Sequence, residues 1–365
     1  AGSAVRSSIV VMSDAPGIVL LASGMLFLAK YFNEPKRYRL VLSFVFFSLG
    51  ISVRYANAII VLAVIICLIY IYRKIPAKKV LLSDTIIAAL AGLVFFIPEF
   101  YYTSSYGISY FNYEGTVGTW ASAWNPVNFF CLFFITFDGT NHYRLYNGLF
   151  FLSPVFHPMY LLMFGLTSLW GMLQAVKKHA TVMIFCFSWI AAYYIYFSGC
   201  PYQSIRYTTS YFPPLIIFSV FGLSTLRFNY RFRITYVLIS IILLAGWSYH
   251  DLGKLNEQKQ KELEVVSWVN TNITASPLIY SFAVTGALNH YTGKNVHEFF
   301  NYNESKLTQE IDSARGDVYF ILPAEVINTQ WSTRPLKGIF DFVMTEYRPV
   351  ELGKVDIYTI YRIDK

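Results

Sequence analysis

Charged residues are scarce in this sequence. Only 14% of its 365 residues are Asp, Glu, Lys or Arg, whereas roughly a quarter are charged in ordinary soluble domains. Hydrophobic residues reach 55% and aromatic residues 19%, which is more apolar side chain than one soluble core of this length could bury. These proportions exclude an ordinary soluble protein and favour a chain whose natural solvent is lipid.

Cysteine and histidine are also few, and neither forms a ligand pattern. The four cysteines include no CxxC pair, and the six histidines include no HxH or HxxxH pair. The sequence therefore offers no zinc, redox or histidine metal motif. Cys131 and Cys200 lie near the ends of apolar stretches and allow two interpretations, a disulfide on an oxidising side or buried free thiols.

An initial methionine and a recognisable signal peptide are missing as well. The sequence begins at Ala1 with a polar stretch that leads directly into an apolar run. We therefore expect that the natural protein has an N-terminal portion that precedes this chain.

Long apolar runs are abundant. A bilayer core of ~30 Å needs ~20 apolar helical residues to cross it. Eight stretches can supply a crossing: 16–32, the two halves of 40–72 on either side of a turn at 54–57, 80–97, 149–173, 181–198, 209–226 and 234–249. The fourth is expected to stop at Pro98. Residues 126–137 are apolar but too short to cross, so we expect a re-entrant or interfacial segment there.

The positions of the basic residues set the orientation. The connections at 30–39, 73–79, 177–179 and 227–233 carry thirteen Lys or Arg, whereas the intervening turns carry three. Basic loops face the cytoplasm in membrane proteins. The sequence therefore predicts a polytopic α-helical protein of the cell membrane, with eight spans and with residue 1 and the C-terminal part outside.

The chain changes character after the last apolar run. We divide it into a membrane bundle at 1–249 and an external soluble α/β domain at 250–365, where charges become frequent and mixed. Residues 257–270 have a helical pattern with Leu263, Val266 and Val269 on one face. Strands are expected at 278–280, 318–322 and 355–363. Sequons at Asn272 and Asn303 are consistent with an external location.

Charged residues on the predicted external face are the candidates for function, because charge at the edge of a membrane span is costly. They come from loops far apart in sequence, and they are Asp14, Arg54, Glu99, Glu114, Asp138, Arg144 and Arg206. Arginines bind phosphate, and carboxylates bind a metal or accept a proton. This mixture suits a substrate that carries phosphate.

Each candidate also has a purely structural interpretation. Asp14 precedes Ala15-Pro16 and can act as a helix N-cap. Arg54 can be an interfacial arginine that extends its guanidinium toward water. Arg206 can be an ordinary loop cation, and Glu99 can be a solvated charge that any long external loop needs. The aromatic residues of the 98–148 region can form an interfacial belt or line a sugar site.

Four sequence elements resemble GT-C glycosyltransferases, the integral membrane enzymes related to protein O-mannosyltransferases and the aminoarabinose transferase of lipid A. In chain order they are Met12-Ser13-Asp14 before an apolar span, Leu49-Gly50-Ile51-Ser52-Val53-Arg54-Tyr55, Gly148-Leu149-Phe150-Phe151-Leu152-Ser153-Pro154, and Arg206-Tyr207 followed by Pro213-Pro214. Their order and topology match the family over roughly residues 12–225.

The resemblance implies transfer of a sugar, with inversion, from a polyprenyl-phosphate donor to a protein, lipid or glycan acceptor on the external face. It implies Asp14 as the catalytic residue and as a ligand of any Mg²⁺ or Mn²⁺. Substrate binding falls to Arg54, Tyr55, Glu99, Arg206 and Tyr207. No nucleic acid is expected as a partner. The family's best-known acidic motif lies in an external loop that would precede Ala1.

Two other classes of function remain open. A transporter of lipid-linked sugar would favour charges near mid-membrane, broken helices and repeat symmetry, whereas here the charges gather at one face and no repeat is visible. A non-catalytic membrane subunit would bind lipid or a partner through the external domain. Residues upstream of Ala1 would discriminate, because an acidic pair in an external loop there would favour the enzyme.

Overall fold

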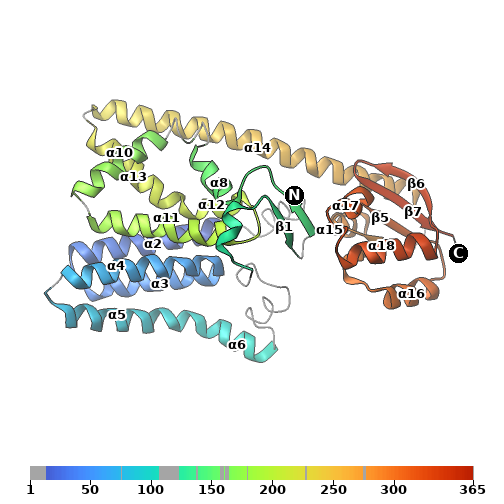
Figure 1. Cartoon of the computed structure of the whole chain (residues 1–365), viewed down its shortest axis with the longest axis horizontal. Helices are drawn as coiled ribbons and strands as arrows, with labels where there is room; N and C mark the ends of the chain where they lie inside the picture. Colours follow the sequence, from blue (N-terminus) through green and yellow to red (C-terminus); the bar gives the residue numbers. More distant parts are fainter. Residues whose placement is uncertain are drawn as a thin grey trace. The chain divides into compact units, whose positions relative to one another are not determined.

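The computed structural model describes residues 14–74, 76–106, 123–136, 139–156, 160, 164–178, 180–226, 228–273 and 277–364. The described residues form two compact units (Figure 1). A helical unit contains the residues up to Leu132 together with Tyr143–Leu244. An α/β unit contains Phe133–His142 and Ala245 onward.

The first half of the helical unit follows the predicted spans. Its elements are α2 (Asp14–Asn33), α3 (Arg37–Val53), η1 (Tyr55–Ile59), α4 (Ile60–Lys74), α5 (Lys78–Leu93), η2 (Val94–Phe96) and α6 (Ile97–Tyr106). Among the described residues, three stretches are long and apolar enough to cross a membrane, Pro16–Asn33, Ala56–Lys74 and Lys78–Phe96. The turn predicted at Arg54 is confirmed, because α3 ends at Val53 and η1 begins at Tyr55.

The fourth predicted span agrees with Lys78–Phe96, but the helical backbone does not stop at Pro98 and continues through α6 to Tyr106. Pro98 lies in the first turn of α6, where a missing backbone N–H removes no helical hydrogen bond. The proline therefore separates two helical segments that follow one another, and it does not end the helical path.

The second half of the helical unit departs further from the predicted spans. Its elements are η3 (Pro126–Phe130), α8 (Asn147–Leu152), η4 (Ser153–Phe156), α10 (Leu166–Lys178), α11 (Ala180–Gly199), α12 (Ile205–Thr208), η6 (Thr209–Tyr211) and α13 (Phe212–Thr225). The single span expected at 149–173 corresponds to α8, η4 and α10, with part of the stretch between them outside the described residues. α8 ends before Pro154, which cannot donate to the carbonyl of Phe150. The hydroxyl of Ser153 donates to that carbonyl instead, at 2.7 Å.

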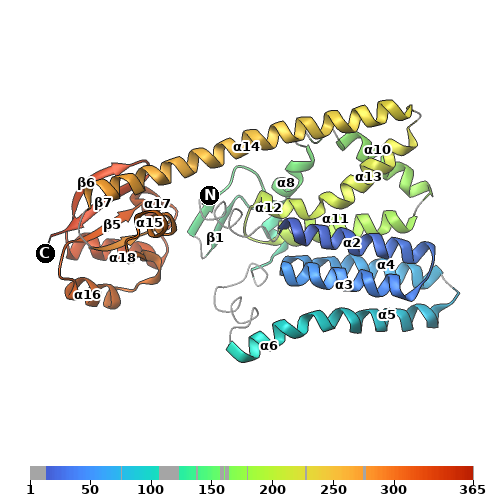
Figure 2. The same cartoon turned by 180° about the vertical axis from the view of Figure 1, so that it is seen from behind.

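The connections that carry the basic residues share one end of the helical unit. Figures 1 and 2 place the α2–α3, α4–α5, α10–α11 and α13–α14 connections at this end, which we call the basic end. η1 and α12 lie toward the opposite end. The helices thus separate the described basic residues of the four connections from Arg54 and Arg206.

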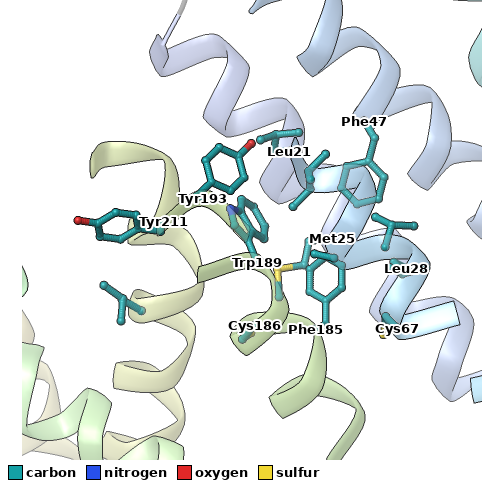
Figure 3. Close-up of a cluster of buried hydrophobic side chains, with 14 of the residues drawn as sticks. Leu21, Met25, Leu28, Phe47, Cys67, Phe185, Cys186, Trp189, Tyr193 and Tyr211 are labelled. Carbon is teal, nitrogen blue, oxygen red and sulfur yellow. The ribbon is translucent and has the colours of Figure 1, made fainter. Parts of the chain in front are cut away.

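A cluster of buried side chains from α2, α3, α4 and α11 holds the helical unit together (Figure 3). Trp189 of α11 is fully buried in it and donates from its indole nitrogen to the carbonyl of Ser210 at 2.8 Å. Glycines let α2 and α3 approach closely, since a Cβ on Gly24 would lie 2.6 Å from the ring of Phe47. Ser43 fixes the same contact by donating to the carbonyl of Gly24 at 2.8 Å.

The α/β unit is built on a five-stranded sheet with strand order β4-β3-β5-β7-β6. Its elements are β3 (Leu278–Ser281), α15 (Thr285–Thr292), β4 (Val296–Glu298), η7 (Phe299–Asn301), α16 (Glu304–Ser313), β5 (Val318–Leu322), α17 (Ala324–Thr329), α18 (Pro335–Glu346), β6 (Val350–Val355) and β7 (Tyr358–Ile363). β3 is parallel to β4 and β5, and β7 is antiparallel to β5 and β6. A further antiparallel hairpin, β1 (Phe133–Thr136) and β2 (Gly139–His142), belongs to this unit.

Central strand β5 is buried along its whole length because helices cover both faces of the sheet. Phe320 contributes to the core shared with α16, α17 and α18, whereas Ile321 contributes to the core shared with α14 (Tyr230–Asn272) and α15. This alternation is what a period of two residues dictates for a strand between two layers. The predicted helical face at Val266 and Val269 is confirmed, since both side chains are buried.

Three predictions for the segments around this unit differ from the structure in detail. The helix predicted at 257–270 is confirmed, but it continues from the stretch at 234–249 as one helix, α14, because no proline lies between the two stretches. The strand expected at 355–363 is confirmed as β7 over Tyr358–Ile363, but it begins three residues later, because Asp356, with φ of +50°, lies in the turn that joins β6 to β7. Residues 126–137 provide η3 and β1, where a re-entrant or interfacial segment was expected.

A polar cluster fastens α16 to the sheet. The hydroxyls of Tyr280 and Tyr302 both donate to the carboxylate of Glu310, at 3.0 and 2.9 Å. Burial and this carboxylate raise the pKa of Tyr302 to about 12. Nδ1 of His297 lies 2.6 Å from the hydroxyl of Tyr302 and acts as the donor, because that hydroxyl spends its one proton on Glu310.

Candidate functional site

The α3–η1 junction places Arg54 at the end of the helical unit opposite the basic end. Arg54 has an extended backbone, with φ of −154° and ψ of 109°, and its N–H donates to the carbonyls of Gly50 and Ile51. The amide of Asn57 donates to the carbonyl of Gly50 at 2.9 Å. The hydroxyl of Tyr193 donates to the backbone carbonyl of Asn57 at 3.3 Å, which ties the junction to α11. The backbone around Arg54 is thereby held from two helices.

The side chain of Arg54 is buried, with 7% of its surface exposed. Its guanidinium carbon lies 5.3 Å from the ring centroid of Tyr207. The ring of Tyr207 stacks on Phe197 of α11, with centroids 4.6 Å apart and an interplanar angle of 11°. Tyr202 meets Tyr207 edge to face at 6.3 Å. The guanidinium of Arg54 thus lies against stacked aromatic rings, and the face of an aromatic ring attracts a cation.

The first turn of α2 packs against the same junction. A Cβ on Gly17 would lie 2.7 Å from the amide nitrogen of Asn57 and 3.8 Å from Cβ of Arg54. Asp14 is the first residue of α2, one helical turn before Gly17. The backbone N–H groups in the first turn of a helix carry partial positive charge. Together with Arg54, they make this end of the helical unit suitable for an anion.

The residues predicted to form the site fall into two groups. Arg54 and Tyr207 are in contact, and the backbones of Asp14, Tyr55 and Arg206 lie beside them in α2, η1 and α12. The side chains of Asp14, Tyr55, Glu99 and Arg206 lie outside the described residues, and so do Glu114 and Asp138. Glu99 belongs to α6, which lies apart from α12 in both views of the molecule (Figures 1 and 2). The structure therefore places the backbone of Glu99 away from the other candidates.

The groups that the structure describes around Arg54 supply few ligands for a divalent metal, and the side chain of Asp14 is not among them. Within the described part of the chain, no group of three His, Cys, Asp or Glu side chains could hold a metal ion. The described groups are a guanidinium, the amide of Asn57 and phenol rings, whereas Mg²⁺ and Mn²⁺ prefer carboxylate oxygens. The sequence left two alternatives for Cys131 and Cys200, a disulfide or free thiols. The structure has all four cysteines as free thiols.

Asp84 was not among the residues that we predicted from the sequence, although a carboxylate inside a predicted span usually has a specific partner or function. It lies in α5 and is buried, with 3% of its surface exposed. It accepts from the hydroxyl of Tyr31 at 3.1 Å and from Nε of Arg37 at 2.7 Å. The three side chains join α2, α3 and α5 near the basic end, which makes Asp84 a structural clamp.

Replacing Asp84 tests this clamp. Asp84→Ala is expected to cost about 1–3 kcal/mol of stability, because it leaves the buried hydroxyl of Tyr31 without its acceptor. The exposed Arg37 can return to water, so the ion pair itself adds little. Asp84→Asn keeps an acceptor and should cost less. Thermal unfolding of the full chain in lipid nanodiscs measures both, with exposed Asp312→Ala as the control. Equal melting temperatures for the parent chain, the two Asp84 variants and the control would show that Asp84 does not stabilise the contact between α2, α3 and α5.

Comparison with known proteins identifies no family for this chain. No protein-family model matches the chain, and no curated protein matches it. The function must therefore be argued from the residues and their arrangement.

Proposed function

We propose that the chain is part of a membrane glycosyltransferase of the GT-C type, which transfers a sugar from a polyprenyl-phosphate donor to a protein, lipid or glycan. The observation that carries the proposal is the buried guanidinium of Arg54, which lies against the stacked rings of Tyr207 and Phe197 beside the first turn of α2. A buried cation among aromatic rings at the end of a bundle suits a phosphate that bears a sugar.

The membrane placement follows from the helices and the basic connections. Three stretches have the length and hydropathy to cross a bilayer, and the apolar helices Met183–Gly199 and Phe212–Thr225 lie beside them in the same unit. The sequences of the four connections carry thirteen Lys and Arg, which supports a cytoplasmic location for the basic end. In this arrangement eight segments cross the membrane, and Arg54, Tyr207 and the α/β unit are external.

The proposed reaction assigns a role to each group. The acceptor hydroxyl oxygen attacks the anomeric carbon, and its proton passes to the carboxylate of Asp14. The bond from that carbon to the phosphate oxygen breaks on the opposite face, and its electron pair leaves with the phosphate. Arg54 and Arg206 stabilise the negative charge that develops there. The ring of Tyr202, which meets Tyr207 edge to face, offers a face for the sugar.

A transfer assay tests the proposal. The natural full-length protein in nanodiscs, given a radiolabelled polyprenyl-phosphate sugar and a membrane extract as the source of acceptor, should release polyprenyl phosphate and yield labelled product. Asp14→Asn should lower transfer at least 100-fold, because the amide keeps much of the capping ability of the carboxylate but cannot take a proton. Exposed Asp312→Asn is the matched control.

Two results would contradict the proposal. Donor that binds but is never cleaved would favour a non-catalytic subunit. Donor that crosses the bilayer intact would favour a transporter. Unchanged transfer by Asp14→Asn would leave the enzyme in place and return Asp14 to a helix cap.

A further inference from the structure

The α/β unit contains a polar groove that no part of the proposed reaction uses. Its cavity is about 510 Å³, and six residues line it: Thr140, Asn141, His142, Thr329, Gln330 and Ser332. None of these side chains is a carboxylate, an ammonium or a guanidinium, and none is aliphatic. The volume falls in the range of roughly 300–1,000 Å³ that is usual for ligand sites.

Specific contacts hold the two walls of this groove together. One wall is β2, and the other is the end of α17 with the turn that follows it. The backbone N–H of Thr140 donates to the carbonyl of Gln330 at 2.5 Å, and the hydroxyls of Thr140 and Thr333 lie 3.2 Å apart. Gly139 is required at this joint. Its φ is +100°, and a Cβ there would lie 2.5 Å from the carbonyl oxygen of Gln330. The groove is therefore formed before any ligand arrives.

The hydrogen-bonding groups in the groove are fixed in orientation. The hydroxyl of Thr329 donates to the carbonyl of Glu325 at 2.8 Å, and that of Ser332 donates to the carbonyl of Thr329 at 2.9 Å. Each hydroxyl thus donates its one proton to a backbone carbonyl, and its oxygen can accept a hydrogen bond from a ligand. The ring of His142 lies against Phe133, with centroids 4.6 Å apart, and can supply a donor.

We infer that this groove binds a neutral carbohydrate. A sugar presents closely spaced hydroxyls, each of which donates and accepts, and these match a lining of fixed acceptors with planar amides and an imidazole. Among the residues that the structure describes, the lining has no charged side chain, which disfavours phosphate and acidic sugars, and no apolar one, which disfavours lipid and hydrophobic peptide. The inference stands whether or not the helical unit transfers sugar.

Saturation-transfer NMR on the full chain in lipid nanodiscs tests the inference. Maltoside detergents must be removed first, since their headgroups are themselves neutral sugars. The probes are maltotriose, mannotriose and triacetylchitotriose, with trigalacturonic acid as the acidic control. We expect saturable binding of at least one neutral probe and little response from the acidic one.

The variants locate the binding. Asn141→Ala and His142→Ala should each weaken it by about 3- to 10-fold, the cost of a lost hydrogen bond. Gly139→Ala should abolish it by separating the walls, and thermal unfolding checks that this protein remains folded. Exposed Gln309→Ala, in α16 of the same unit, should bind as the parent does. The inference is overturned if no neutral probe binds, if the acidic probe binds equally well, or if Asn141→Ala and His142→Ala leave binding unchanged.

Discussion

Gly222→Leu is expected to prevent the helical unit from folding. A Cβ on Gly222 of α13 would lie 2.0 Å from the carbonyl oxygen of Thr167 in α10. The reciprocal contact is as close, because a Cβ on Gly171 would lie 1.8 Å from the carbonyl oxygen of Phe218. Both obstacles are backbone atoms of a packed helix, which cannot turn aside as a flexible side chain would. We therefore expect a loss of more than about 3 kcal/mol, above the usual cost of overpacking.

The polar contacts between α10 and α13 depend on the same close approach. The hydroxyls of Thr167 and Ser219 lie 2.5 Å apart, and that of Ser168 donates to the carbonyl of Leu215 at 2.9 Å. Small residues and such hydrogen bonds are what hold helices together when lipid removes the hydrophobic driving force. Separating the helices to accommodate a leucine would break both contacts.

A matched control isolates the effect of packing. Gly246 is also helical, in α14, and a Cβ there would meet nothing within 4 Å. Gly246→Leu should leave stability unchanged or raise it, since leucine favours a helix more than glycine does. The yield of monodisperse protein and its melting temperature compare the two variants. Similar values for Gly222→Leu and Gly246→Leu would show that α10 and α13 are not packed as described.

The sequence was most informative where hydropathy alone decides structure. The runs at 16–32 and 80–97 correspond to helices of spanning length, and the pattern break at Arg54 marks the end of α3. An uninterrupted apolar run much longer than ~20 residues cannot cross a bilayer once, so a turn is required within it. The polar residues at 54–57 were the natural place for that turn.

The sequence was less informative where hydrogen bonding decides structure. Pro154 and Pro98 look alike as helix breakers, yet one follows the end of α8 and the other lies in the first turn of α6. The turn at Asp356 divides an apolar run that reads as one strand. Hydropathy averages over such single-residue effects, so the boundaries that depend on them were misplaced.

The candidate site was only partly predictable for a related reason. Charges at span ends identified Arg54, and the neighbour of Arg206 proved to be its aromatic contact. Nothing in the sequence links Asn57, Tyr193 and Phe197 to that site, because their roles come from contacts between α11 and the α3–η1 junction. Asp84 could have been found, since its charge lies within a predicted span.

Arg54→Ala is expected to weaken binding of a polyprenyl-phosphate sugar by roughly 30-fold or more. In the proposed site this buried guanidinium binds the phosphate of the donor. Loss of such a desolvated contact between opposite charges costs about 2–5 kcal/mol. Arg54→Lys keeps the charge but loses the fork that binds two phosphate oxygens, so binding should fall less steeply. Equilibrium binding of radiolabelled donor to the full chain in nanodiscs, at equal folded abundance, measures both. Arg73→Lys at the basic end is the matched control.

Substitutions of Tyr207, the aromatic partner of Arg54, separate a role in donor binding from a role in the structure. Tyr207→Phe keeps a ring against Arg54 and should retain most of the affinity, whereas Tyr207→Leu removes the ring and should weaken donor binding. A double-mutant cycle of Arg54→Ala with Tyr207→Leu, measured as donor binding, should give a coupling energy of about 0.5–2 kcal/mol, because each substitution removes the partner of the other. If Arg54→Ala is folded and binds the donor as the parent chain does, the phosphate is held elsewhere, and Arg54 is an interfacial anchor stacked on Tyr207.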